Sequence, residues 1–289
     1  MRISQVLSQL VCLQGATRCT ATVRPARCRK LRKVAYFWGT MNIEYEVKYH
    51  QIEENYWWFQ ARRDMVFRLV QDLHLATNAT ILEIGCSGGP LLQRLRNTGY
   101  TNLTGIDVSE VGIAVAQQRG IPNVSCMDGT NLTFPDASFD LVVASDVLEH
   151  IEDEAQALRE WTRVLRPGGQ LLIFVPAFQF LWGRHDEVNR HFRRYTAAQL
   201  ATSMQSAGLK IRRRSYWNVS LFFPTATVRL FKRLLPEEKK PAKDDFFATP
   251  PLLNTLLSGV IRAENRLLQA LNAPVGVSVF VLAVKAPAV

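Results

Sequence analysis

Five polar residues stand where apolar, strand-like segments of the sequence end. The segments are short and bounded by polar or small residues, which is typical of buried strands. In an open parallel sheet the carboxyl ends of the strands share one edge, and ligands bind there. One acid at such an end is usually a solvated loop residue, but several are hard to explain by core packing. The sequence therefore predicts a site for a polar ligand, lined by Glu83, Asp107, Asp128, Ser145 and Asp146.

The segment 85–89, Gly-Cys-Ser-Gly-Gly, follows the first of these strands. Small residues allow a tight turn and a close approach of the backbone to a ligand, and the helix that starts after them offers unpaired N–H groups. The same residues also read G-x-S-x-G, the nucleophile elbow of α/β-hydrolases. Ser87 would then be the nucleophile, with His150, His185 or His191 as a partner. The loop alone leaves both interpretations open.

The elements that would position these residues alternate between strand and helix. Near-continuous apolar strands separated by helices predict a parallel sheet that is covered on both faces. The expected strands are 80–84, 102–106, 124–127, 141–144, 170–175, 209–216 and 275–284, and the expected helices are 44–75, 90–96, 109–119, 153–165 and 196–208.

The positive charge of the chain is concentrated at its beginning. The sequence has 289 residues and a net charge of +10, but its first 40 residues hold eight Lys or Arg and no acid. The rest has 27 basic and 25 acidic residues, a net charge of +2, which argues against nucleic acid as a partner. No apolar run reaches the roughly 18 residues of a membrane-spanning helix.

Residues 1–40 differ from the rest of the sequence in composition. An Arg-rich leader without acids resembles an organellar transit peptide, which would imply import into an organelle. Alternatively Met41 is the true start, which we favour because the composition changes there. In both cases we expect this leader to lie outside the native fold.

We expect one domain after the leader. Its cysteines, Cys86 and Cys126, are isolated in the sequence, which favours a reducing, cytoplasmic location and argues against a disulfide framework. The expected parts of the domain 41–289 are a core at 78–216, a helical insertion at 217–272 and a last strand at 275–284.

Four segments, in the order ILEIGCSGG, LTGIDVS, CMDGTNLTFPDASFDLVVASDVLEHI and RVLRPGGQLLIFVP, give the chain a family resemblance. Together they resemble the class I S-adenosylmethionine-dependent methyltransferases over about residues 78–210. The resemblance implies a Rossmann-like α/β fold, with a seven-stranded, mostly parallel sheet, helices on both faces and an antiparallel last strand. It also implies S-adenosyl-L-methionine as the cofactor. The helical insertion before the last strand is an addition to the minimal fold.

In this family the glycine loop binds the methionine part of the cofactor. The resemblance therefore implies cofactor contacts for Glu83, Gly85, Ser87 and Gly89. The family usually has glycine where this chain has Ser87. Serine is small, and we expect the loop to keep its path with Ser87 in a non-glycine backbone conformation. Ser87 is then a substituted glycine and not a nucleophile.

The polar residues after the later strands also acquire roles from the resemblance. Asp107 would accept hydrogen bonds from the ribose hydroxyls, as the acid after the second strand does in dinucleotide-binding folds. Asp128 would bind the adenine amino group, with Gly129 beside it. Ser145 and Asp146 would line the site near the methionine amine and the methyl group.

The flanking segments 54–63, 185–196 and 274–278 resemble methyltransferases of the type 11 and ubiquinone-biosynthesis-like groups. The resemblance implies an enzyme that moves a methyl group to an O, N or C atom of a small-molecule, lipid, quinone-type or glycan acceptor. The charged segment 184–195 follows the fifth strand, where this family usually builds the acceptor pocket, unless it is only a solvated loop. The alternatives are a non-catalytic cofactor-binding protein and an α/β-hydrolase.

Three residues are candidates for the chemistry itself. An oxygen or nitrogen acceptor loses a proton, and His150 is the first candidate base because it follows the fourth strand, although it could instead only bond to the backbone. His185 is a second candidate, and Tyr195 is a candidate acceptor contact. Asp146-x-x-Glu149-His150 resembles the E-x-x-E-H segment of quinone O-methyltransferases, which implies a divalent metal. Aspartate replaces the first glutamate, and we expect no metal.

Two aromatic segments have more than one interpretation. Trp57, Trp58 and Phe59 indicate either a helix packed on the sheet or a lid over the site, with Arg62 available to an anion. The inserted segment 217–272 combines aromatic and basic residues in its first part, 217–235. It could cap the pocket or join the core, which we favour, contact an anionic membrane peripherally, or bind a partner subunit. The sequence does not fix the oligomeric state.

Overall fold

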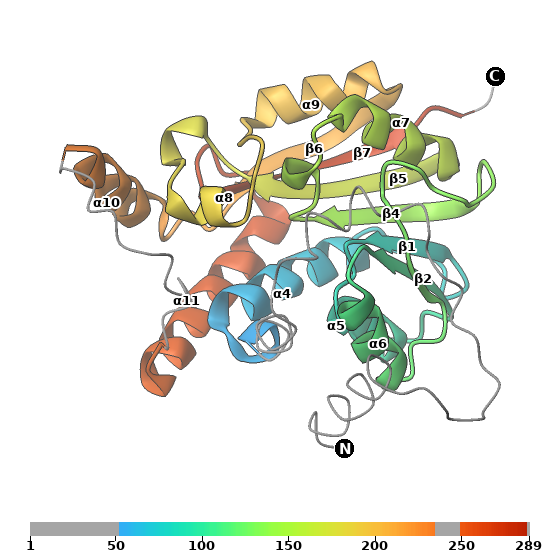
Figure 1. Ribbon diagram of the computed structural model, residues 1–289, viewed down its shortest axis with the longest axis horizontal. Coiled ribbons are helices and arrows are strands. Elements are labelled where there is room, and N and C mark those ends of the chain that lie inside the picture. Colours follow the sequence, from blue (N-terminus) through green and yellow to red (C-terminus); the bar gives the residue numbers. More distant parts are fainter. Residues whose placement is uncertain (1–51, 235–248, 288–289) are drawn as a thin grey trace, which may run out of the picture. The chain divides into compact units, whose positions relative to one another are not determined.

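The computed structural model describes residues 52–234 and 249–287, which contain a seven-stranded sheet (Figure 1). The predicted leader 1–40 and the first part of the predicted helix 44–75 lie outside the described residues. The strands lie in the order β3-β2-β1-β4-β5-β7-β6. Their bounds are β1 Thr80–Ile84, β2 Asn102–Asp107, β3 Val124–Cys126, β4 Phe139–Ser145, β5 Leu165–Pro176, β6 Leu209–Trp217 and β7 Ser278–Lys285.

Strands β1 to β5 are parallel, and β7 is antiparallel to both of its neighbours, β5 and β6. The direction in which the chain adds strands reverses between β1 and β4, and ligands bind at such a switch point. The predicted Rossmann-like sheet with an antiparallel last strand is confirmed. The carboxyl ends of β1, β2, β3 and β4 therefore share one edge.

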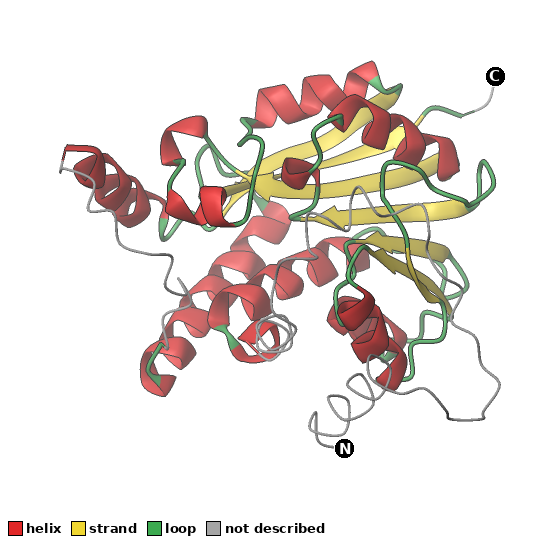
Figure 2. Ribbon diagram, viewed as in Figure 1, coloured by secondary structure: helices red, strands yellow, loops and turns green. Residues whose placement is uncertain are grey.

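Helices cover both faces of the sheet (Figure 2). One hydrophobic cluster joins the sheet to α4, α5, α6 and α11, and a second joins the opposite face to α7 and α9. Because successive strand residues point to opposite faces, Ile81 belongs to the first cluster and Leu82 to the second. The bounds are α4 Trp57–Gln71, α5 Pro90–Arg96, α6 Glu110–Gln118, α7 Glu154–Val164, α9 Ala197–Ser206 and α11 Pro251–Ala270.

Local sequence determines where several helices start. The side chains of Ser109 and Asp153 each accept the backbone N–H three residues further on. Thr196 and Gln199 bond to each other's backbone N–H groups, so the predicted capping box is present. These caps satisfy N–H groups that a helix start otherwise leaves unpaired.

Strand β5 begins earlier than the predicted strand 170–175. Leu165 already pairs with Phe139, and the register then shifts before the main pairing of β4 with β5. Gly168 has φ of 80° within this irregular stretch, a conformation that favours glycine. The early start depends on a distant strand, so the local pattern could not predict it.

The insertion between β6 and β7 contains one helix that belongs to the core. Asn265 of α11 accepts a hydrogen bond from Trp217 Nε1 at 2.7 Å and donates one to the carbonyl of Ala61 at 2.9 Å. This supports the core interpretation for α11, and the buried Trp57 supports packing of α4 on the sheet. Among the described residues no helix has the length and apolar character needed to cross a bilayer. The remaining elements are η1 Leu148–His150, η2 Gln179–Leu181, α8 Arg184–Val188 and α10 Phe222–Leu234.

Candidate active site

The glycine loop after β1 takes a path that needs its glycines. Gly85 and Gly89 have φ of 74° and 72°, and a Cβ on either would overlap a neighbouring side chain. Ser87 also lies in the left-handed region, with φ of 49°, so the expected non-glycine conformation is wrong. Its N–H donates to Asp107 Oδ2 at 2.8 Å and its hydroxyl donates to Glu53 Oε2 at 2.6 Å. These bonds offset a backbone strain of roughly 1–2 kcal/mol.

Asp107, at the end of β2, connects the loop to the next helix. Its Oδ2 accepts the N–H of Ser87 and its Oδ1 accepts the N–H of Ser109, each at 2.8 Å. Each carboxylate oxygen has two lone pairs and can accept more than one hydrogen bond. The carboxylate is therefore oriented by the backbone before any ligand arrives.

Glu83, near the end of β1, is a buried acid with 8% exposure. Its Oε2 atom has no hydrogen-bond partner among the residues that the structure describes. Burial raises the pKa of Glu83 well above its ordinary value, and the charge of Glu53 adds to this, while Arg63 opposes it. A neutral Glu83, or one that accepts a hydrogen bond from a ligand, fits this environment.

The turn after β3 fixes the next pair of predicted residues. Asp128 Oδ1 accepts the N–H of Thr130 at 2.8 Å and its hydroxyl at 2.9 Å, so a local turn orients the carboxylate. The carbonyl of Gly129 accepts a hydrogen bond from Trp161 Nε1 at 2.8 Å. A Cβ on Gly129 would lie 3.1 Å from Ile84 Cγ2, so the turn lies against the end of β1.

Asp146 follows β4 with φ of 59°, in the left-handed region. Ser145 Oγ donates to its Oδ2 at 2.9 Å, and Arg62 Nη2 lies 3.3 Å from its Oδ1. The structure thus brings the predicted pair Ser145 and Asp146 together at the edge of the sheet. The anionic partner of Arg62 in the structure is therefore Asp146, a residue of the chain itself.

Arg62 is only 4% exposed. Its guanidinium lies 5.0, 4.7 and 4.3 Å from the ring centroids of Trp58, Phe174 and Trp217, where cation–π attraction applies. Its Nη2 also donates to Ser278 Oγ at 2.5 Å. The residue therefore joins α4 to the end of β4 and to the start of β7, which the sequence pattern did not predict.

His150, the first candidate base, ends the turn η1 directly after β4. Burial, and then the neighbouring His191, lower the pKa of His150 to about 3, so the imidazole is neutral at pH 7. Its Nδ1 has no hydrogen-bond partner within 52–234 and 249–287. The ring centroid of His191 lies 4.6 Å from that of His150 and 5.9 Å from that of His185. The three histidines of the sequence prediction thus form one group.

Tyr195, the predicted acceptor contact, lies in the core and is 3% exposed. Its hydroxyl donates to Glu154 Oε2 at 2.6 Å, and Ser203 Oγ donates to the other oxygen at 3.0 Å. Burial raises the pKa of Tyr195, and Glu154 raises it further. These contacts give Tyr195 a place between α7 and α9.

The segment 184–195 is organised around Asp186, which is fully buried. The carboxylate accepts hydrogen bonds from His191 Nδ1, from Arg194 Nε and Nη2, and from the N–H of Gly183, at 2.8 to 3.1 Å. Burial acts to raise the pKa of Asp186, but the bonds from His191 and Arg194 outweigh it and the pKa is lowered. Sequence reasoning missed this arrangement around Asp186, although the neighbouring His and Arg residues were a visible signal, and it named Glu149 only within the segment Asp146-x-x-Glu149-His150.

Residues 82–173 match a family described as "Methyltransferase domain". A probable S-adenosylmethionine-dependent methyltransferase of Mycolicibacterium smegmatis is 34% identical over 163 residues, which are 55% of this chain and 61% of that protein. The ubiquinone biosynthesis O-methyltransferase of Pseudomonas aeruginosa is 33% identical over 99 residues, which are 32% of this chain and 42% of that protein. The chain thus spans less than two thirds of either relative.

A solved structure, that of the [4+2]-cyclase SpnF, has a similar fold. The TM-score is 0.52 and the identity is 24%, over 78% of this chain and 81% of that chain. Identity at this level supports likeness of fold alone.

Proposed function

Since the chain carries a class I S-adenosylmethionine-dependent methyltransferase domain, we propose that the protein transfers a methyl group from S-adenosyl-L-methionine to a small-molecule acceptor. The observation that carries the proposal is the tie between the glycine loop and the acid of β2. Ser87 N–H and Ser109 N–H both donate to Asp107. The loop and the acid are therefore held as one preorganised surface at the switch point of the sheet.

The proposed cofactor contacts follow this edge from β1 to β4. The loop, with Gly85, Ser87 and Gly89, would bind the methionine part, and buried Glu83 would accept a hydrogen bond near it. Asp107 would bind the ribose hydroxyls. The other proposed contacts are Asp128 and Gly129 at the adenine, and Ser145 and Asp146 near the methionine amine.

The chemistry requires mainly alignment. A sulfonium is an activated methyl donor, and holding donor and acceptor in line can supply about 7–11 kcal/mol of the barrier. An oxygen or nitrogen acceptor also needs a base. His150 is neutral at pH 7 and its Nδ1 has no partner among the described residues, so this atom is open to a proton from the acceptor, which supports His150 as that base. Its low pKa makes it a weak base. His185 is a second candidate.

The acceptor belongs to the proposal only as a class: a small-molecule, lipid, quinone-type or glycan compound, methylated on O, N or C. One relative is named a ubiquinone biosynthesis O-methyltransferase, which supports a hydroxyl on a quinone-type ring among these. The segment 184–195 follows β5 and contains His185 and His191. It would form part of the acceptor site.

Two measurements test the proposal. Calorimetric titration of the purified protein with S-adenosyl-L-methionine should give saturable binding, and adenosine serves as the control for the methionine part. Incubation of a lysate with the labelled methyl donor should then place label in one compound that mass analysis identifies. Failure to bind the cofactor would contradict the proposal.

A second candidate function is cofactor binding without methyl transfer. The fold is also that of a [4+2]-cyclase, and a fold alone does not determine a reaction. Binding of the cofactor with no labelled product from any extract fraction would favour this candidate. The hydrolase alternative loses support, since the Ser87 hydroxyl donates to Glu53 and the domain matches methyltransferases.

A further inference from the structure

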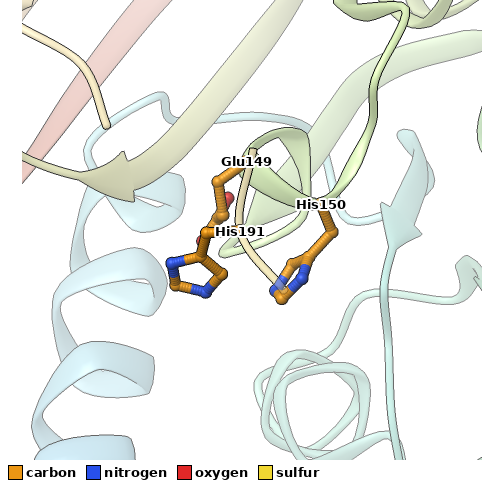
Figure 3. A group of neighbouring side chains, drawn as sticks. All are labelled: Glu149, His150 and His191. Atoms are coloured by element: carbon orange, nitrogen blue, oxygen red, sulfur yellow. The ribbon is translucent and has the colours of Figure 1, made fainter. Parts of the chain in front are cut away.

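Three side chains from two segments converge beside the end of β4 (Figure 3). Glu149 and His150 belong to η1, and His191 belongs to the segment between α8 and α9. One potential ligand atom of each lies within 4.8 Å of the other two. The N–H of Phe192 donates to the carbonyl of Glu149 at 2.8 Å, which holds the two segments together at this point. We call these three residues the histidine–carboxylate group.

Two of the three side chains have buried atoms that lack a partner. Glu149 is 1% exposed and its Oε2 accepts no hydrogen bond from the part of the chain that the structure describes. His150 Nδ1 is also a buried atom without a hydrogen-bond partner among the described residues. Buried polar atoms are almost always satisfied in native proteins, because an unsatisfied one costs roughly 1–3 kcal/mol. Two such atoms on neighbouring residues of the same turn point to a ligand that binds there.

The second ring nitrogen of His191 is already engaged. His191 Nδ1 bonds to Asp186 Oδ1 at 2.8 Å, which leaves Nε2 for a ligand. Nδ1 of His150 has no partner in the described residues and is therefore the atom left for an ion. Histidines that bind metals usually have their second nitrogen held by a carboxylate or a carbonyl in this way.

The positive charges nearby are already paired. Arg194 donates to Asp186 through Nε and Nη2, and Arg62 lies against Asp146. Glu149 has no such salt bridge among the described residues, so its carboxylate is available to a cation. The pairing of Asp146 with Arg62 also removes Asp146 as a third ligand, the place that the sequence pattern alone would give it.

We propose that Glu149, His150 and His191 bind a divalent transition-metal ion. Two imidazoles and one carboxylate suit ions such as Zn²⁺, Co²⁺ or Fe²⁺, whereas Mg²⁺ and Ca²⁺ prefer oxygen ligands. Ligands about 2.1 Å from a tetrahedral ion lie about 3.4 Å apart, so the three side chains close in by roughly an ångström. This replaces the expectation, from sequence, of no metal.

The ion and the base role of His150 exclude each other, since both use the Nδ1 lone pair. Metal binding is independent of methyl transfer and can be measured without the methyl donor. Its failure would therefore leave the proposed function intact and return His150 to the role of base.

The test is a titration of the chelator-stripped full chain with Co²⁺, followed by visible absorption, and with Zn²⁺, followed by calorimetry. We expect one ion per chain and the d–d absorption of nitrogen-coordinated Co²⁺. The substitutions Glu149→Gln and His191→Gln should each weaken binding at least tenfold. His185→Gln is the matched control, because the His185 ring contacts that of His191 but is not part of the histidine–carboxylate group. This variant should bind the ion as the wild type does.

A second measurement covers the case in which a variant fails to fold. In the wild-type chain, Co²⁺ should broaden the imidazole NMR signals of His150 and His191 before those of His74. Absence of a stoichiometric site would overturn the proposal. So would loss of the site in Asp146→Asn together with its retention in His191→Gln, since the third ligand would then be Asp146.

Discussion

Ser87 illustrates how a single residue can keep a backbone path that usually needs glycine. Its left-handed conformation is retained because its N–H bonds to Asp107 and its hydroxyl to Glu53. The side chain that causes the strain also supplies one of the bonds that offset it. The hydroxyl is thus part of the loop structure, which separates this site from a hydrolase elbow.

We expect Ser87→Gly to keep cofactor affinity within about threefold of wild type. Glycine removes the strain of roughly 1–2 kcal/mol but also loses the bond to Glu53, so the two effects nearly cancel. Calorimetry with S-adenosyl-L-methionine measures the affinity, and Ser87→Ala, which keeps the strain without the bond, should be the weaker binder. A folded Ser87→Gly protein that cannot bind the cofactor would refute the substituted-glycine interpretation.

Asp107→Ala should weaken cofactor binding at least about 100-fold. The change removes a charged acceptor of two hydrogen bonds that the ribose hydroxyls would donate, each contributing about 1.5–3 kcal/mol, and also frees the loop N–H groups. The same titration gives the affinity. Glu110→Gln, an exposed acid at the start of the adjoining helix α6, is the control and should have no effect. Equal affinities for the two variants would rule out the ribose role.

At the scale of elements, Asp64 of α4 connects three helices. It accepts hydrogen bonds from Arg68 on its own helix at 2.7 Å, from Arg94 of α5 at 2.8 Å and from Asn265 of α11 at 3.0 Å. The helix that precedes β1 and the helix of the late insertion thus share one acid. Burial acts to raise the pKa of Asp64, but these bonds outweigh it and the pKa is lowered.

Asp64→Asn should lower the free energy of unfolding by about 1–3 kcal/mol at pH 7, a range that allows for solvent screening of the partly exposed arginines. A lowered folded pKa means that the contribution is present above the unfolded pKa of about 3.9 and is lost as the pH falls through the folded value. Urea unfolding at pH 7 and near pH 3 measures both. The difference between the variant and the wild type should be smaller at the lower pH than at pH 7.

Asp72→Asn provides the comparison for this prediction. Asp72 is exposed at the end of α4 and accepts one bond, from Gln269, at 3.0 Å. Its replacement should change the free energy of unfolding by less than about 0.5 kcal/mol. A difference between Asp64→Asn and wild type that stays constant with pH would show that the charge of Asp64 does not stabilise the fold.

At the scale of the whole molecule, the local sequence pattern predicted which elements form. Long-range contacts determine some of their bounds and the partners of the site residues. Strand β1 ends where the sequence predicted, at Ile84 before Gly85, and β2 ends at Asp107, one residue later than predicted. The start of β5 differs more from the prediction, since Phe139 determines it from another strand. The acids of the site were readable at the strand ends. Arg62 and His191 were named from the sequence, but their partners at this edge were not, because only tertiary packing brings these side chains there.

Peripheral membrane contact through 217–235 stays a prediction at this scale. Helix α10 contains no acid, and its Phe223 and Phe231 are 68% and 62% exposed. Arg229 and Lys232 lie on the same helix. Exposed aromatic residues beside basic ones are typical of helices that rest on anionic membranes.

Sedimentation with lipid vesicles tests this contact. The full chain should bind vesicles that contain anionic lipid and not neutral ones, and the double change Phe223→Ser with Phe231→Ser should reduce binding at least about tenfold, given roughly 0.8 kcal/mol for each CH₂ removed from water. Leu267→Ser, on an exposed face of α11, is the matched control. Equal binding by the double variant would assign the exposed face another role.

The bond between Arg62 and Ser278 has a consequence for synthesis on the ribosome. Every proposed cofactor contact has been translated by residue 146, yet Arg62 holds Asp146 within a set of contacts that Ser278 completes at 2.5 Å. Strand β7, which begins there, is also the one strand that pairs with β6 among the residues that the structure describes. We expect ribosome-bound chains stalled before residue 272 to be far more sensitive to protease than released full-length chains. The site would then become functional only in the last moments of translation.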